Sequence, residues 1–357
     1  MTQQEPLLVF ISAYTGGDDS AIHAYELDPD TGSMGLIHRT TDVAYPFMMT
    51  LSPDRRFLYT NHSVGGFGKG GDQVAAYELV GRTGELKLLN RQSAVGTAAC
   101  YMEIDSSARS VLVAHYDSGQ IVSLPVLKDG TLGEVVSVMT HEGSSVNADR
   151  QECAHGHCVV VSPDDRFAYA ADLGIDKVMC YRLDAATAML SPNEQPFVST
   201  RPGAGPRHLT FHPNGKFVYL INELDSTITL FDYEVDSGFL TERQTIPTLP
   251  PDFDGHNQCA DIKCTPDGRF LYGTNRGHDS IAAYRIDDNG GLTLLAIEPS
   301  LGKGPQNLAM TPDGGLLLCA NEPSHNVVLF RVDSKAGGLS QVGESITMPE
   351  PSCIVMV

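Results

Sequence analysis

A short turn segment recurs along the chain and constrains the fold more than any other feature of the sequence. It begins with Ser, Thr or His, continues with Pro and then Asp or Asn, and carries Phe or Leu four residues after the Pro. Five copies lie at residues 52–57, 162–167, 212–217, 265–270 and 311–316, and a degenerate copy lies at 105–110. Pro followed by Asp or Asn favours a tight β-turn, so each copy predicts a hairpin connection. Such self-similarity indicates a fold built from repeated units.

Short β-prone runs follow the turns at regular intervals. The starts of seven such runs are 46 to 57 residues apart, and they lie at Leu7, Phe57, Ser110, Phe167, Phe217, Phe270 and Leu316. This interval fits a four-stranded blade of a β-propeller. Short strands, frequent turn signals and the lack of a helical period predict an all-β fold.

Seven further runs precede the turns, and the last of them ends the chain. We expect them to be strands, at Pro46–Leu51, Ala99–Ile104, Gly156–Val161, Pro206–Phe211, Cys259–Cys264, Pro305–Met310 and Pro351–Val357. The N-terminus, by contrast, begins directly with a post-turn run. The economical arrangement is a ring in which Pro351–Val357 is the inner strand of the blade formed by residues 7–40, because closure removes free sheet edges. We therefore predict one domain over residues 1–357, a seven-bladed β-propeller.

The charge balance excludes several classes of partner. The chain has 357 residues with 24 Lys and Arg against 44 Asp and Glu, a formal charge of −20. Nucleic acids and anionic membranes both require a basic surface, so neither is expected as a partner. No apolar run is long enough to span a membrane, the N-terminus lacks the features of a secretory signal, and the eight Cys lie scattered in apolar stretches. These features predict a cytoplasmic protein with reduced thiols and leave its oligomeric state open.

The second residue of each inner strand is a candidate for the central channel. These residues are Phe47, Cys100, His157, Arg207, Ala260, Gln306 and Ser352. If they point to the axis, the channel entrance carries an imidazole, a guanidinium and an amide from separate blades. A repeat does not need such different residues at equivalent positions, so the deviations indicate where function acts.

A second ring of polar residues ends the post-turn strands. Its members are Ser12, His62, His115, Asp172, Asn222, Asn275 and Asn321, and the next residues are Ala13, Ser63, Tyr116, Leu173, Glu223, Arg276 and Glu322. Asn and Asp favour turns, so a purely structural role for the asparagines stays open. Comparison of the blades selects one set of candidate site residues, namely His155, His157, Arg207, His208, Glu223 and Arg276.

Two features of the sequence raise the question of a metal or a phosphate site. Cys153, His155 and His157 alternate along a predicted strand and could share one face as a zinc set, but the nearby arginines would oppose a cation. The glycine-rich stretch 65–71 precedes a strand rather than a helix, so it is expected to be an enlarged loop over the channel mouth. The insertion at 142–153 is either a polar lid or a long surface loop. We predict neither a metal nor a cofactor.

Three motifs resemble those of a known family. They are the stretch Gly203-Ala204-Gly205-Pro206-Arg207-His208 with the following Asn222-Glu223, the pair His155-Gly156-His157, and Asn275-Arg276-Gly277-His278. Together with the repeat spacing, the whole chain resembles the lactonase family of seven-bladed propellers, which contains propeller-type 6-phosphogluconolactonase and the fungal 3-carboxymuconate lactonizing enzyme. The resemblance implies catalytic roles for His157, Arg207, Glu223 and Arg276. One departure is Asp261, where a longer Glu is common in the family.

The resemblance also implies a substrate, a small anionic lactone. We expect hydrolysis of 6-phosphoglucono-δ-lactone in the pentose phosphate pathway, with one arginine stabilising the oxyanion and the other binding the anionic group. His157 and Glu223 both remain candidates for the general base. Further residues are expected to contact substrate, namely His155, His208, Asn222, Asn275 and Gln306. The alternatives are a carboxymuconate lactonizing enzyme, a lactonase for another lactone, and a non-enzymatic binding scaffold.

Overall fold

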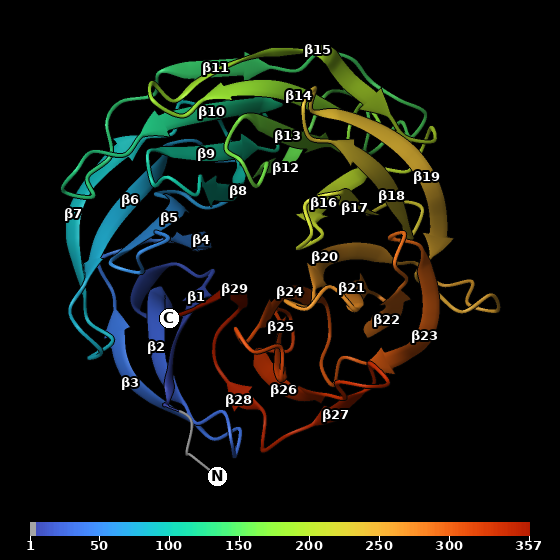
Figure 1. The fold of residues 1–357 in the computed structure, drawn as a ribbon. Helices are drawn as coiled ribbons and strands as arrows, with labels where there is room; N and C mark the ends of the chain where they lie inside the picture. Colours follow the sequence, from blue (N-terminus) through green and yellow to red (C-terminus); the bar gives the residue numbers. More distant parts are fainter. Residues whose placement is uncertain (1–4) are drawn as a thin grey trace.

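Seven antiparallel sheets stand around a common axis in the computed structural model, which describes residues 5–357 (Figure 1). Each sheet is one blade, and one of its edge strands lies nearest the axis. The all-β, seven-bladed propeller predicted from the repeats is confirmed.

The strands of each blade run antiparallel, in order from the axis outward. Blade 1 contains β29 (Pro351–Met356), β1 (Leu7–Ala13), β2 (Ala21–Leu27) and β3 (Met34–Thr40). Blade 2 contains β4 (Pro46–Leu51), β5 (Phe57–Ser63), β6 (Asp72–Leu79) and β7 (Leu86–Ser93). Blade 3 contains β8 (Ala99–Ile104), β9 (Ser110–His115), β10 (Gln120–Pro125) and β11 (Ser137–Thr140). Blade 4 contains β12 (Gly156–Val161), β13 (Phe167–Asp172), β14 (Lys177–Asp184) and β15 (Met189–Ser199).

The remaining three blades complete the ring. Blade 5 contains β16 (Pro206–Phe211), β17 (Phe217–Asn222), β18 (Thr227–Glu234) and β19 (Phe239–Pro247). Blade 6 contains β20 (Gln258–Cys264), β21 (Phe270–Arg276), β22 (Ser280–Ile286) and β23 (Leu292–Pro299). Blade 7 contains β24 (Pro305–Met310), β25 (Leu316–Asn321), β26 (Asn326–Val332) and β27 (Leu339–Gln341), and the short β28 (Ile346–Thr347) also pairs with β26.

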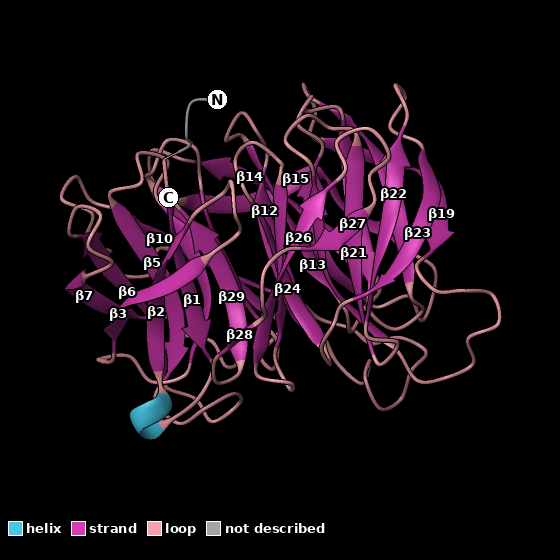
Figure 2. Cartoon of the chain, turned by 90° about the horizontal axis from the view of Figure 1, so that it is seen from below, coloured by secondary structure: helices cyan, strands magenta, loops and turns pink. Residues whose placement is uncertain are grey.

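Helical structure is almost absent from the described residues. One 3₁₀ turn, η1 (Gly17–Asp19), lies at the edge of the molecule (Figure 2). Within residues 5–357 no helix has the length and apolar character needed to cross a membrane.

The two ends of the chain close the ring as predicted. The C-terminal β29 pairs antiparallel with β1, with Val9 opposite Met356 and Ile11 opposite Ile354. The N-terminal blade thus receives its inner strand from the far end of the chain, and the pairing covers an edge that would otherwise be free to aggregate.

The recurring turn segment is held by its own side chains. In the first copy Ser52 Oγ donates to Asp54 Oδ1 (2.6 Å) and accepts from the Phe57 amide (3.0 Å). Arg55 has the left-handed backbone of this turn (φ 57°), and a Gly occupies the equivalent position in the last three of the five copies. The hairpins therefore form from local residues alone.

Adjacent blades are joined by a repeated contact between an aromatic pair and a glycine. The buried Tyr59 hydroxyl donates to the carbonyl of Gly130 in the next blade (3.1 Å), and the Phe57 ring covers that glycine so closely that a Cβ would lie 2.3 Å from it. The same bond joins Tyr169 to Gly238, Tyr219 to Gly290 and Tyr272 to Gly337. The Phe-x-Tyr runs thus set the spacing of the blades.

A β-bulge near the start of each inner strand aims one residue toward the axis. In blade 5 Pro206 pairs with Asn222 and His208 with Ile221, so Arg207 has no residue opposite it. The registers also shift at the start of the other inner strands, as at His157 in blade 4 and Gln306 in blade 7. A bulge turns a side chain out of the ladder, and here it presents the second residue of the strand to the channel.

Candidate active site

One end of the channel holds a cavity of about 330 Å³. Its lining consists of Phe47, Phe67, Cys100, Tyr116, Arg150, His157, Arg207, Glu223, Gln258, Arg276 and Gln306. All four residues predicted to be catalytic are in this set, together with Gln306. Five of the seven second-position residues line the cavity, so the prediction from strand position holds for most of the ring.

Glu223 is the centre of the cavity's charges. Its Oε1 accepts a hydrogen bond from Arg150 Nη2 (2.6 Å), and its Oε2 accepts from Arg207 Nε (2.9 Å) and Arg276 Nη2 (2.8 Å). Burial alone would raise the pKa of this carboxyl group, but Arg276 and Arg207 overcome that effect and hold the pKa below its usual range. Glu223 is therefore ionised at neutral pH and holds the three arginine side chains in place.

Arg207 is the most deeply buried of these cations, with 2% of its side chain exposed. Besides Glu223, it donates from Nη1 to the carbonyl of Ala260 (2.6 Å) and to His208 Nε2 (3.1 Å). Burial, followed by the positive charge of Arg276, lowers its pKa to about 10. The guanidinium remains charged at neutral pH, and none of these bonds uses Nη2.

Arg276 and Arg150 lie on the more open side of the cavity. Their side chains are 23% and 30% exposed. Arg276 donates from Nη1 to Gln306 Oε1 (3.2 Å) and from Nε to the carbonyl of Gln258 (3.3 Å), while Arg150 donates to the Tyr116 hydroxyl (3.2 Å). Both guanidiniums are thus oriented by the cavity wall but remain accessible to a ligand.

His157 faces the same cavity with a neutral imidazole. Its Nε2 lies 3.7 Å from Glu223 Oε2, and its buried Nδ1 has no hydrogen-bond partner among the described residues. Burial, reinforced by the positive charge of Arg207, lowers the pKa of His157 well below its ordinary value. A neutral imidazole can accept a proton, which the triply bonded Glu223 is poorly placed to do.

Asp261 supports Arg207 from outside the cavity through His208. Its Oδ1 accepts from His208 Nδ1 (2.9 Å), and its Oδ2 accepts from Asn307 Nδ2 (2.8 Å) and the Leu308 amide (2.9 Å). Because His208 donates from Nδ1, its Nε2 is the acceptor for Arg207. His208 thus lies behind the guanidinium rather than in the cavity lining.

Three other residues predicted to contact substrate lie outside the lining set. Asn222 and Asn275 are buried and donate to hydroxyl groups of their own blades, to Thr227 (2.9 Å) and Ser280 (3.1 Å) respectively. His155 stacks on Tyr116 with ring centroids 4.3 Å apart. The two asparagines join strands, which agrees with the structural role left open from the sequence.

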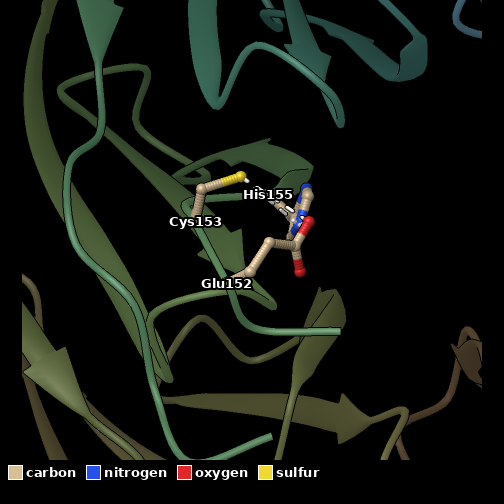
Figure 3. A group of neighbouring side chains, drawn as sticks. All are labelled: Glu152, Cys153 and His155. Atoms are coloured by element: carbon tan, nitrogen blue, oxygen red, sulfur yellow. Dashed lines mark hydrogen bonds and ion pairs between the residues drawn. The ribbon is translucent and has the colours of Figure 1, made fainter. Parts of the chain in front are cut away.

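The structure separates His157 from the other members of the possible zinc set. His155 precedes β12, and the bulge in that strand turns His157 toward Glu223. His155 instead lies with Cys153 and Glu152 (Figure 3). The expected period-two alternation fails because it assumes a regular ladder.

Two loops singled out by the sequence reach the cavity. Phe67, from the glycine-rich stretch, and Arg150, from the insertion at 142–153, are both lining residues. Arg150 is not among the residues predicted from the sequence. The one sequence feature that points to Arg150 is its position in the long connection before the His-x-His strand. Its contact with Glu223 depends on how that connection folds, which the sequence pattern does not show.

Comparison with known proteins agrees with this arrangement. The family model described as a lactonase with a seven-bladed β-propeller matches residues 8–356. The chain is 33% identical over 346 residues to 6-phosphogluconolactonase of Bacillus subtilis, covering 97% of each protein, and 30% identical over 355 residues to the enzyme of that name from Formosa agariphila, covering 98% of this chain and 99% of that one. The solved periplasmic gluconolactonase of Pseudomonas aeruginosa is 31% identical and superposes with a TM-score of 0.93 over 99% of each chain. The chain belongs to the family of seven-bladed β-propeller lactonases.

Proposed function

We propose that the protein hydrolyses a sugar-acid lactone, 6-phosphoglucono-δ-lactone, to 6-phosphogluconate. The observation that carries this proposal is the convergence of three guanidiniums and one neutral imidazole on a single cavity of about 330 Å³. The cavity has room for one small ligand, and its arginines suit an anionic one. The names of the relatives from Bacillus subtilis and Formosa agariphila support the same substrate. The proposed setting is the pentose phosphate pathway of the cytoplasm.

Arg150 and Arg276 are the proposed phosphate-binding residues. They are the accessible cations of the cavity, and each guanidinium has donors beyond those used with Glu223. Guanidinium groups bind phosphate through paired hydrogen bonds, which fixes both position and orientation. The phosphate of the substrate would therefore hold the lactone ring over the deeper part of the cavity.

Arg207 is the proposed oxyanion-stabilising residue. Attack on the lactone carbonyl places negative charge on its oxygen, and Arg207 presents a fixed, buried positive charge next to His157. A preoriented donor in a site sheltered from water stabilises such charge, and the loss of one donor typically costs about 10²–10³ in kcat. Its bonds to Glu223, Ala260 and His208 keep the guanidinium in place during the reaction.

His157 is the proposed general base. It would take a proton from the attacking water as the C–O bond forms, and the nearby Glu223 carboxylate would stabilise the resulting imidazolium. When the tetrahedral intermediate collapses, the bond from the carbonyl carbon to the ring oxygen breaks and the imidazolium returns its proton to that oxygen. The products are a hydroxyl group and a carboxylic acid, which ionises in water.

The test is a lactonase assay on 6-phosphogluconolactone generated in situ, with the spontaneous hydrolysis rate subtracted. His157→Gln and Arg207→Ala should each lower kcat by about 10²-fold or more, whereas Arg150→Gln should mainly raise KM. Arg182→Gln is the matched control, since Arg182 pairs with Glu194 on the outer surface. No acceleration by the wild-type protein would reject the proposal.

A substrate panel separates this function from its alternatives. Unphosphorylated glucono-δ-lactone tests whether the arginines select for phosphate, and 3-carboxymuconate tests the lactonizing reaction, which the same cations could serve. Preference for either compound would transfer the assignment to that substrate. Failure of all three substrates would favour a binding scaffold.

A further inference from the structure

A second group of side chains lies beside the cavity and takes part in none of the proposed catalytic steps. It consists of Glu152, Cys153 and His155, which lie on one short segment and point toward one another (Figure 3). His155 Nε2 lies 3.2 Å from Glu152 Oε1 and 3.7 Å from Cys153 Sγ, and the sulfur lies 3.9 Å from the same carboxylate oxygen. Each residue offers a donor atom of a type that metals bind.

These three distances match one face of a tetrahedral zinc site. With bonds of about 2.0–2.1 Å to nitrogen and oxygen and about 2.3 Å to sulfur, tetrahedral angles place nitrogen ~3.3 Å from oxygen and ~3.6 Å from sulfur, and sulfur ~3.5 Å from oxygen. The observed 3.2, 3.7 and 3.9 Å differ from these values by a few tenths of an ångström. A small rotation of the exposed Glu152 side chain would close the remaining gap.

The histidine has the tautomer that metal binding requires. His155 Nδ1 lies 2.9 Å from the carbonyl oxygen of Tyr116, which can only accept, so Nδ1 carries the hydrogen. In the neutral form of this tautomer, Nε2 would carry the lone pair, directed at the sulfur and the carboxylate. A hydrogen bond from the far nitrogen to a carbonyl is the usual support of a metal-binding histidine.

The backbone holds the donor residues in this arrangement. The His155 amide donates to Asp172 Oδ1 (2.8 Å), and its carbonyl accepts from the Leu173 amide (2.9 Å). Gly174 packs against the segment so closely that a Cβ there would lie 1.8 Å from the Cys153 carbonyl oxygen. The approach of the two chain segments therefore requires glycine, and the donor atoms are preorganised.

We propose that Glu152, Cys153 and His155 bind a thiophilic divalent cation, Zn²⁺, with a water molecule as the fourth ligand. One thiolate, one imidazole and one carboxylate are a ligand set that zinc accepts, whereas magnesium and calcium prefer oxygen alone. Cys153 is exposed, whereas six of the other seven cysteines are buried and Cys264 is partly buried, so a cation can reach the site from solvent.

The site lies next to residues of the cavity. His155 stacks on Tyr116, and the Tyr116 hydroxyl accepts from Arg150. A cation bound at the end of the insertion 142–153 would therefore fix the segment that carries Arg150. The binding proposal itself rests only on the donor geometry and stands independently of the proposed lactonase function.

The experiment measures zinc binding to the purified, reduced full-length protein by equilibrium dialysis against Zn²⁺, and Co²⁺ serves as a spectroscopic probe. Wild type should bind one equivalent, and Co²⁺ should produce the thiolate charge-transfer absorption of a cysteine ligand. Cys153→Ser and Glu152→Gln should lower zinc affinity, the former by at least about 100-fold. Cys264→Ser is the matched control, because Cys264 is partly accessible but lies in blade 6.

Three outcomes would overturn the proposal. One is the absence of zinc binding at micromolar concentration. Another is full binding by Cys153→Ser, and the third is equal loss in Cys264→Ser. The far-ultraviolet circular dichroism spectrum of each variant would be compared with that of wild type, so that unfolding is not mistaken for the loss of a zinc ligand.

Discussion

Replacing Glu223 with Gln tests whether this carboxylate balances the three arginines of the cavity. The substitution keeps the size of the side chain and removes the charge that Arg150, Arg207 and Arg276 share. The loss of stability comes mainly from Arg207, because its guanidinium is almost fully buried and water cannot replace the lost carboxylate. We expect a folded protein with markedly reduced stability.

The size of the effect follows from the burial of the pair. Removing one partner of a buried ion pair typically costs about 3–5 kcal/mol. For a chain of 357 residues, an unfolding entropy of about 2.1 cal/mol/K per residue amounts to ~0.75 kcal/mol/K. Glu223→Gln should therefore lower Tm by about 4–7 °C.

The assay is thermal unfolding with and without inorganic phosphate. An anion that binds between the uncompensated arginines would restore part of the lost stability, and at about 100 times its Kd it adds ~2.7 kcal/mol, or about 4 °C. The wild-type protein, whose arginines are already paired with Glu223, should gain less. Glu194→Gln is the control, because Glu194 forms an exposed pair with Arg182 and should change Tm by no more than about 1 °C.

Two results would refute this reasoning. If Glu223→Gln were as stable as wild type, the arginines would be neutralised by something other than Glu223. If phosphate stabilised both proteins equally, its binding would not depend on the charge removed at Glu223, and the anion would not be compensating the unpaired arginines.

Three further expectations follow from the buried groups. Because the pKa of His157 is lowered, kcat/KM should be flat near neutral pH and fall only below about pH 6.5 as the imidazole gains a proton. A decline already beginning above pH 7 would mean that the pKa of the catalytic base is not lowered. Burial lowers the pKa of His115 and of His208 to about 4, so between pH 6.5 and 4 the unfolded chain binds protons that the folded protein does not. Acidification through this range should therefore lower Tm, and His115→Leu should make the slope shallower; an unchanged slope would mean that His115 does not contribute to the acid response. Tyr272→Phe removes the buried bond to Gly337 and should cost about 1–3 kcal/mol in denaturant unfolding, whereas no loss would mean that this bond does not stabilise the contact between blades 6 and 7.

The architecture can be predicted from the sequence because its determinants are local and repeated. The turn copies carry their own hydrogen bonds, as between Ser52 and Asp54, and each is followed by a strand. Ring closure follows from counting strands at the two ends. The inter-blade contacts of Tyr59 with Gly130 are also repeated, but they join residues 71 apart, and no local pattern pairs them.

The site is only partly predictable, because its geometry depends on contacts between blades. The comparison of equivalent positions finds His157, Arg207 and Glu223, whose places in the fold are set by strand number and bulge position. The same comparison does not find Arg150, since the insertion that carries it has no equivalent in the other blades. Comparison of the blades also selects His155, and alternation along the strand places it on one face with His157, but the bulge in β12 removes the basis of that shared face.

Asp261 shows how a departure from the family pattern can be compatible with the same site. Although its side chain is shorter than Glu, the carboxylate reaches His208 in blade 5 and the amides of Asn307 and Leu308 in blade 7. Burial would raise its pKa, but Lys263 and His208 lower it, so the group stays ionised. A charged Asp261 fixes the His208 tautomer, which in turn leaves Nε2 to accept from Arg207. The position of the buried guanidinium thus depends on three blades at once, and a shorter carboxylate suffices because its partners already lie within hydrogen-bonding distance.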